Sequence, residues 1–187
     1  GIAAAEDAGF SPVKLNCVVR RGVNDDGIDA LVDFARHRGH TLRFIEYMDV
    51  GGSNGWRSED VVPAAEVIER IAQRHQLQAA PPSRRGEVAR RLRFREGGGE
   101  IGVITSVSQP FCADCTRIRM SADGQMYTCL FATRGHDLAA PLRAGAGADE
   151  LAVLIRRLWT SRDDRYSELR SQQRTGAPRV EMSYIGG

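Results

Sequence analysis

A strand, helix and strand near the start of the chain constrain the fold most. Residues 13–19 (VKLNCVV) and 41–48 (TLRFIEYM) are rich in the β-branched and aromatic residues of short buried strands. Between them, apolar residues recur on one helical face from Ile28 to a glycine stop at Gly39. Strands joined through a helix run parallel, so we expect a βαβ unit. Because two strands cannot close a barrel, this unit must belong to a larger α/β sheet or barrel.

The remaining sequence predicts an α+β region. Two helices are expected, one from Pro63 to about Gln76 and one from about Asp149. Two pairs of strand-like segments are each joined by a glycine-containing turn and are expected to form antiparallel hairpins: 87–95 with 100–107, and 117–121 with 125–131. The last eight residues, VEMSYIGG, favour a strand. We therefore expect two domains, residues 1–60 and residues 61–187.

Charge and hydropathy exclude several classes of function. The 187 residues include 26 Lys and Arg against 24 Asp and Glu, so the net charge of +2 gives no global field for nucleic acid or membrane. No apolar run approaches the ~18 residues of a membrane span. The first ten residues, GIAAAEDAGF, lack the basic start of a signal peptide. We expect a cytoplasmic protein with neither membranes nor nucleic acids as partners.

Three of the four cysteines crowd into one segment. Cys112 and Cys115 form a C-x2-C knuckle, and Cys129 follows on the far arm of the second expected hairpin. Since the hairpin returns Cys129 to the knuckle, three thiolates can converge on one metal centre. Two centres fit this spacing. A zinc site would take His136 as its fourth ligand, whereas an iron–sulfur cluster with three cysteines would leave one iron open to a substrate.

Arginines accompany the cysteines. Arg117 and Arg119 alternate along the strand after Cys115, so both guanidinium groups can hold a phosphate or carboxylate from one face. Without the cysteines an exposed strand face would be the simpler interpretation, but a metal with an open position beside the arginines favours anion binding. A second group of arginines forms a basic stripe: Arg84, Arg85, Arg90, Arg91, Arg93 and Arg95. With zinc at the cysteines, this stripe would suit a zinc-knuckle module that binds nucleic acid or a protein partner.

Longer motifs point to one family. They are TLRFIEYMDVGGSNGW, GEVARRLRF, IGVITSVSQPFCADCTRIRMSADGQMYTCLF, WTSRDDRYSELR and the terminal YIGG. Together they resemble the C-terminal part of the GTP 3',8-cyclases of molybdenum-cofactor biosynthesis, radical S-adenosylmethionine (SAM) lyases, over nearly the whole chain. The resemblance implies the last part of an incomplete (β/α) TIM-type barrel, followed by an α+β region that carries a second [4Fe–4S] cluster. It also implies a homodimer.

The resemblance assigns roles to individual residues. Cys112, Cys115 and Cys129 match the ligands of the second cluster, whose open iron binds the guanine of GTP. The positions that match GTP-binding residues are Lys14, Arg43, Arg117, Ile118 and Arg119. Met48 matches a position that contacts SAM, and the Gly186–Gly187 tail matches one that reaches into the active site.

One family feature is missing from this sequence. The cluster that cleaves SAM is held by a C-x3-C-x2-C motif in the family, and the only cysteine upstream of Cys112 is Cys17. The chain is thus either a fragment of a longer enzyme or a truncated relative. We expect no catalytic residue in it, and we expect the isolated chain to be unable to cleave SAM.

Overall fold

The computed structural model describes residues 1–170 and 180–185, which form two compact units. The first unit joins Gly1–Met48 with Trp56–Phe111. The second joins Asp49–Gly55 with the described residues from Cys112 onward. The expected domain boundary at residues 60 and 61 therefore passes through the first unit.

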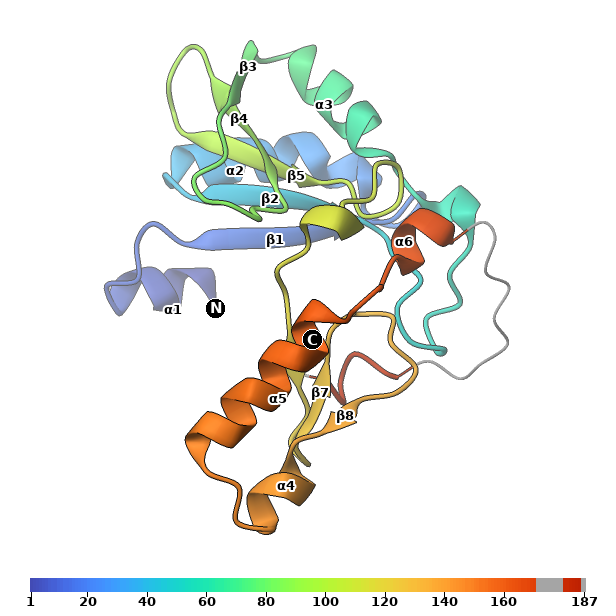
Figure 1. Cartoon of the computed structure of the whole chain (residues 1–187). Helices are drawn as coiled ribbons and strands as arrows, with labels where there is room; N and C mark the ends of the chain where they lie inside the picture. Colours follow the sequence, from blue (N-terminus) through green and yellow to red (C-terminus); the bar gives the residue numbers. More distant parts are fainter. Residues whose placement is uncertain (171–179, 186–187) are drawn as a thin grey trace. The chain divides into compact units, whose positions relative to one another are not determined.

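A five-stranded mixed sheet with helices forms the first unit (Figure 1). Its elements are α1 (Ile2–Asp7), β1 (Lys14–Val19), η1 (Asp25–Gly27), α2 (Ile28–His37), β2 (Thr41–Glu46), η2 (Ser58–Asp60), α3 (Ala64–Ala72), β3 (Leu77–Ala80), β4 (Arg90–Phe94) and β5 (Glu100–Ile104). The strand order is β1-β2-β5-β4-β3. Strands β1 and β2 are parallel, and β4 and β5 are antiparallel, so the βαβ unit and the first hairpin are confirmed.

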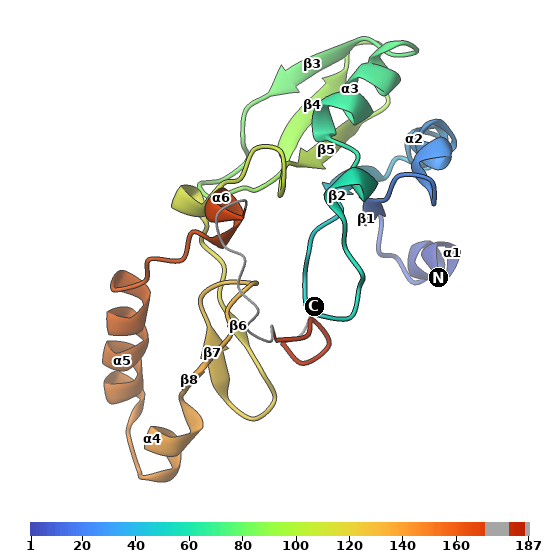
Figure 2. The same cartoon turned by 90° about the vertical axis from the view of Figure 1, so that its right-hand side faces the viewer.

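The sequence did not predict how these two motifs join. Strand β5 pairs in parallel with β2, with Leu42 opposite Ile101, so one continuous sheet contains both motifs. Alternate residues of β2, among them Leu42 and Phe44, are buried on the face that α2 and α3 cover (Figure 2). Val32 from α2 and Ile71 from α3 complete this core with at most 1% of their surface exposed. The sheet thus has one helix-covered face and one face without helices from this unit.

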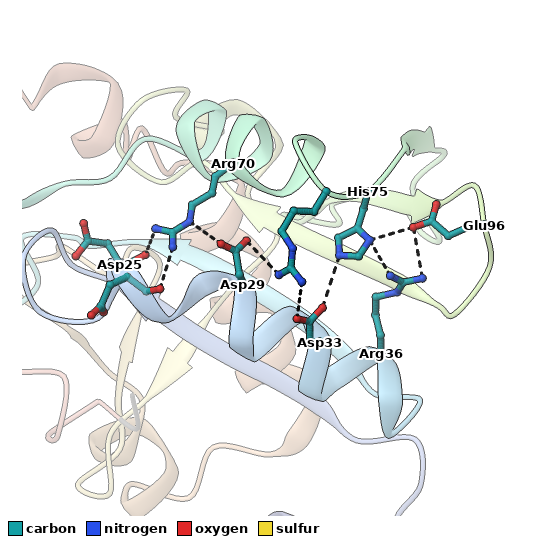
Figure 3. Close-up of polar contacts among 9 residues, drawn as sticks. Asp25, Asp29, Asp33, Arg36, Arg70, His75 and Glu96 are labelled. Carbon is teal, nitrogen blue, oxygen red and sulfur yellow. Dashed lines mark hydrogen bonds and ion pairs between the residues drawn. The ribbon is translucent and has the colours of Figure 1, made fainter.

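Ion pairs connect α2, α3 and the turn of the first hairpin (Figure 3). Arg70 Nε lies 3.2 Å from Asp29, and His75 Nδ1 lies 3.1 Å from Glu96. Arg36 also reaches Glu96, at 3.4 Å. Most of these side chains are at least a fifth exposed, so water screens each pair and its contribution to stability is small. We interpret them as a stabilising network and not as a site.

In its described residues, the second unit contains a three-stranded antiparallel sheet, one 3-10 helix and three α-helices. Its elements are η3 (Cys112–Asp114), β6 (Arg119–Met120), β7 (Gln125–Tyr127), β8 (His136–Asp137), α4 (Ala139–Arg143), α5 (Ala148–Thr160) and α6 (Tyr166–Leu169). The sheet order is β6-β7-β8, which confirms the second hairpin with shorter strands than expected. Helix α5 lies alongside this sheet in both views (Figures 1 and 2). No helix among the described residues is both long and apolar enough to cross a membrane.

The glycine-rich loop Asp49–Gly55 folds with the second unit because its polar groups bind there. Asp49 accepts hydrogen bonds from the Tyr166 hydroxyl at 2.6 Å and from Arg170 Nε at 2.9 Å. The Gly52 N–H donates to the Glu181 carboxylate at 2.8 Å. The sequence predicted a strand over the last eight residues. This prediction is wrong for the residues of that segment that the structure describes. They form a turn over 182–185, because side chains such as Glu181 bind loops in place of a neighbouring strand.

Candidate metal and nucleotide site

The β6–β7 hairpin joins the three clustered cysteines. Cys112 and Cys115 close one turn of 3-10 helix, in which the Cys115 N–H donates to the Cys112 carbonyl at 3.2 Å. Cys129 follows shortly after β7, and all three thiols are partly buried. Among residues 1–170 and 180–185, no group of three or more His, Cys, Asp or Glu side chains lies close enough together to bind a single metal ion.

Cys115 and Cys129 differ in acidity. Burial raises the pKa of Cys129 to about 11, although the Phe131 N–H donates to its Sγ at 3.4 Å and opposes this shift. The negative charges of Asp164, Cys112 and Cys115 raise the Cys129 pKa further. For Cys115, burial acts in the same direction, but hydrogen bonds from Arg117 outweigh it and hold the pKa below its usual value. Such N–H···S contacts stabilise thiolates, the form that binds metals.

Two arginines share the side of the chain on which Cys115 lies. Cys115, Arg117 and Arg119 are partly buried, whereas the residues between them are exposed, including Ile118 at 42%. Arg117 Nη2 lies 3.5 Å from Cys115 Sγ. Burial, followed by the charge of Arg117, lowers the pKa of Arg119. Two guanidinium groups that repel each other beside a cysteine knuckle form a site that an anion would stabilise.

The segment after α5 contacts Cys115 and Phe131, which lies two residues after Cys129. Arg162 donates to the carbonyl of Cys115, and its guanidinium lies 3.6 Å from the ring centre of Trp159. The Tyr166 ring stacks on Phe131 at 4.4 Å. Reasoning from residue chemistry missed these side chains. The only signal for them was the motif WTSRDDRYSELR, which carries no metal-ligand spacing.

The other expected site residues belong to the first unit. Lys14 and Arg43 lie on the face of the sheet opposite the helices, where Asn16 is the register partner of Arg43. A Cβ at Gly102 would lie 3.2 Å from Arg43 Cγ, so this glycine leaves room for the arginine stem. Met48 is partly buried and follows β2.

Three further expectations have different outcomes. The Gly186–Gly187 tail lies outside the described residues. His136, the possible zinc ligand, is exposed on β8 opposite Met126. Within the basic stripe, Arg91 pairs with Glu100 at 2.6 Å, so part of the positive charge that was expected for nucleic acid is neutralised.

Comparison with known proteins identifies the family. The family model described as Molybdenum Cofactor Synthesis C matches residues 40–168. The chain belongs to this family. The whole chain is also 51% identical to a protein named GTP 3',8-cyclase from Acidothermus cellulolyticus, and it covers 59% of that protein's length. Proteins of the same name from Xanthomonas axonopodis pv. citri and Parasynechococcus marenigrum are 55% and 49% identical to it over the whole chain.

These similarities confirm the family that the motifs indicated. This member of the Molybdenum Cofactor Synthesis C family spans between 54% and 59% of the length of the relatives named here. Activity, substrate and partners of the longer relatives are therefore proposals for this chain.

Proposed function

We propose that this chain is the nucleotide- and cluster-binding part of a GTP 3',8-cyclase, a lyase that converts GTP to 3',8-cyclo-7,8-dihydro-GTP by radical cyclisation. The observation that carries the proposal is the placement of Arg117 and Arg119 on the same side of the chain as Cys115. This arrangement would combine metal ligands and anion-binding groups on one hairpin. Similarity over the whole chain to proteins named GTP 3',8-cyclase supports it.

The second unit would hold the cluster and the nucleotide. The donor set of Cys112, Cys115 and Cys129 fits a [4Fe–4S] cluster, because such clusters are bound by cysteine thiolates. Bound by three thiolates, the cluster would supply an open iron as a Lewis acid for the guanine base. Arg117 and Arg119 would bind the triphosphate, with Ile118 between them. The hydrogen bond from Arg117 to Cys115 favours the thiolate form.

The first unit carries the remaining residues that we propose for substrate and SAM. The parallel strands β1, β2 and β5 would be the last part of an incomplete (β/α) barrel, whose sheet face without helices carries Lys14 and Arg43 for GTP. Met48, after β2, would contact SAM. Since barrel active sites gather at the carboxyl ends of strands, Met48 is well placed for this role.

Two further properties follow from the same proposal. The 187 residues contain no C-x3-C-x2-C motif, so this chain alone is not expected to cleave SAM. Detection of GTP-dependent SAM cleavage by the purified chain would contradict this. A second copy of the chain is the proposed partner in a homodimer.

Metal analysis tests the cluster. After anaerobic reconstitution we expect about four irons and four sulfides per chain, and an electron paramagnetic resonance spectrum of the reduced sample that changes on adding GTP. Cys129→Ala should abolish cluster loading, whereas Cys17→Ala, in β1 of the first unit, should leave it intact. One tightly bound zinc without iron would favour the zinc-knuckle alternative and overturn the proposal.

Nucleotide binding tests the arginines. Replacing Arg117 and Arg119 together by alanine should weaken GTP binding by more than about a hundredfold, because charge-assisted hydrogen bonds contribute roughly 1.5–3 kcal/mol each and about 1.4 kcal/mol corresponds to a tenfold change in affinity. Iron content should not change. The matched control replaces the exposed Arg134 and Arg143 of the same unit. Equal GTP affinity in the two double variants would show that Arg117 and Arg119 do not bind GTP.

A further inference from the structure

Asp49 holds one side chain of α6 and one of the residue that follows this helix. It begins the loop Asp49–Gly55 and has 5% of its surface exposed. One carboxylate oxygen accepts a hydrogen bond from the Tyr166 hydroxyl at 2.6 Å, and the other accepts one from Arg170 Nε at 2.9 Å. Because the side chains of Arg170 and Asp49 are only 12% and 7% exposed, water screens this ion pair little. Asp49 therefore fixes the orientation of both side chains.

Tyr166 and Arg170 both contact the ring of Phe131. The Tyr166 ring stacks on it, with 4.4 Å between the ring centres and an angle of 24° between the ring planes. The Arg170 guanidinium lies 5.5 Å from the centre of the Phe131 ring, which is within the range of a cation–π contact. Phe131 is 8% exposed. Contacts of this kind restrict a buried ring to one position, so Asp49 acts on Phe131 through these two side chains.

The backbone of Phe131 contacts a cysteine of the expected metal centre. Its N–H donates to Cys129 Sγ at 3.4 Å. Hydrogen bonds to ligand sulfurs help to set the reduction potential of an iron–sulfur cluster. They raise this potential, because they stabilise the reduced form, in which the sulfurs carry more negative charge. The direction of the Phe131 N–H depends on where the ring of the same residue is held.

We propose that Tyr166 is a positioning residue that keeps the Phe131 N–H on the Cys129 sulfur and thereby raises the reduction potential of the cluster. Asp49 orients Tyr166 for this role. The inference rests on the proposed function, which assigns a cluster to the three clustered cysteines. Tyr166 is not a ligand in this proposal and acts only through the ring of Phe131. Loss of the Tyr166 ring should therefore weaken the N–H···S bond and make the cluster harder to reduce.

A redox titration of the reconstituted chain, followed by electron paramagnetic resonance, tests the proposal. Tyr166→Leu removes the stacked ring without changing any charge. It should lower the ratio of reduced to oxidised cluster at a fixed potential by about tenfold, which is a shift of about 59 mV for a one-electron couple. Tyr166→Phe keeps the ring and loses only the bond to Asp49, so its shift should have the same sign and be smaller. The matched control Tyr184→Phe removes another 2.6 Å hydrogen bond of the same unit, from Tyr184 to Asp123, and should keep the wild-type potential.

Amide exchange decides the matter if Tyr166→Leu loads no cluster. In the metal-free chain, the Phe131 amide should exchange faster in Tyr166→Leu than in the wild type or in Tyr184→Phe, because its hydrogen bond to sulfur is weakened. A wild-type potential in loaded Tyr166→Leu, or unchanged exchange at Phe131, would overturn the inference and leave the proposed function standing. Equal shifts in Tyr166→Phe and Tyr166→Leu would also overturn it, since the stacked ring would then have no effect. A wild-type chain that binds zinc without iron would overturn both.

Discussion

Glu46 is a buried carboxylate whose removal should destabilise the first unit strongly. It ends β2 with 2% of its surface exposed. One oxygen accepts the N–H of Ala64, the first residue of α3, at 2.8 Å. The other accepts the N–H groups of Val107 and Ser108 at 2.7 and 2.8 Å. A single side chain therefore connects a strand end, a helix start and the segment after β5.

The substitution Glu46→Gln isolates the effect of the carboxylate. Glutamine has nearly the same shape, but its NH2 group would face at least one N–H donor, whichever way the amide is oriented. Because a hydrogen bond to a charged group contributes roughly 1.5–3 kcal/mol and an orphaned donor adds a desolvation cost, we expect a loss of about 3–5 kcal/mol. The control Glu59→Gln changes a glutamate whose side chain is 69% exposed, and it should cost no more than about 0.5 kcal/mol.

Urea unfolding and amide exchange measure this loss. With a denaturant slope of about 1–3 kcal/mol/M, the unfolding midpoint should fall by more than about 1 M in Glu46→Gln. The amides of Val107 and Ser108 should exchange faster, because they lose their acceptor. A destabilisation below about 1 kcal/mol, with unchanged exchange at these two amides, would refute the reasoning.

Two more predictions concern the second unit. In the metal-free protein at pH 8, iodoacetamide should modify Cys115 well before Cys129, because Arg117 lowers the pKa of Cys115 whereas a thiol with a pKa of about 11 is only about 0.1% ionised at this pH. Peptide mass spectrometry measures both rates, and an unchanged rate at Cys115 in Arg117→Ala would contradict this. Gly51→Ala should destabilise its loop by about 1–2 kcal/mol, because Gly51 has a φ of +66° and a Cβ there would collide with a carboxylate. Gly52→Ala, with ordinary contacts at 3.5 Å, should be tolerated in the same thermal unfolding assay.

Local sequence patterns were sufficient to predict the helices and hairpins whose formation depends on neighbouring residues. The helical face from Ile28 and the turn at Asp123–Gly124 predicted α2 and the β6–β7 hairpin, since periodicity and turn chemistry act within a few residues. The cysteine spacing likewise predicted that a hairpin would bring Cys129 back toward the knuckle. The terminal strand failed for the opposite reason. A turn forms at 182–185 because Glu181 binds a loop more than a hundred residues away in sequence.

The sequence by itself determined the family, the cysteine knuckle and the arginines beside it, because these depend on residue identity and short spacing. Only the tertiary structure decided that β5 joins β2 in parallel and that the loop Asp49–Gly55 folds with the second unit. It also showed that Asp164 is partly buried, with a buried oxygen that has no hydrogen-bond partner in the described structure, whereas Asp163 is exposed. Asp163 and Asp164 are neighbouring residues of the same type, so the sequence alone does not distinguish them. Burial and hydrogen-bond satisfaction distinguish them, and both depend on contacts between distant segments.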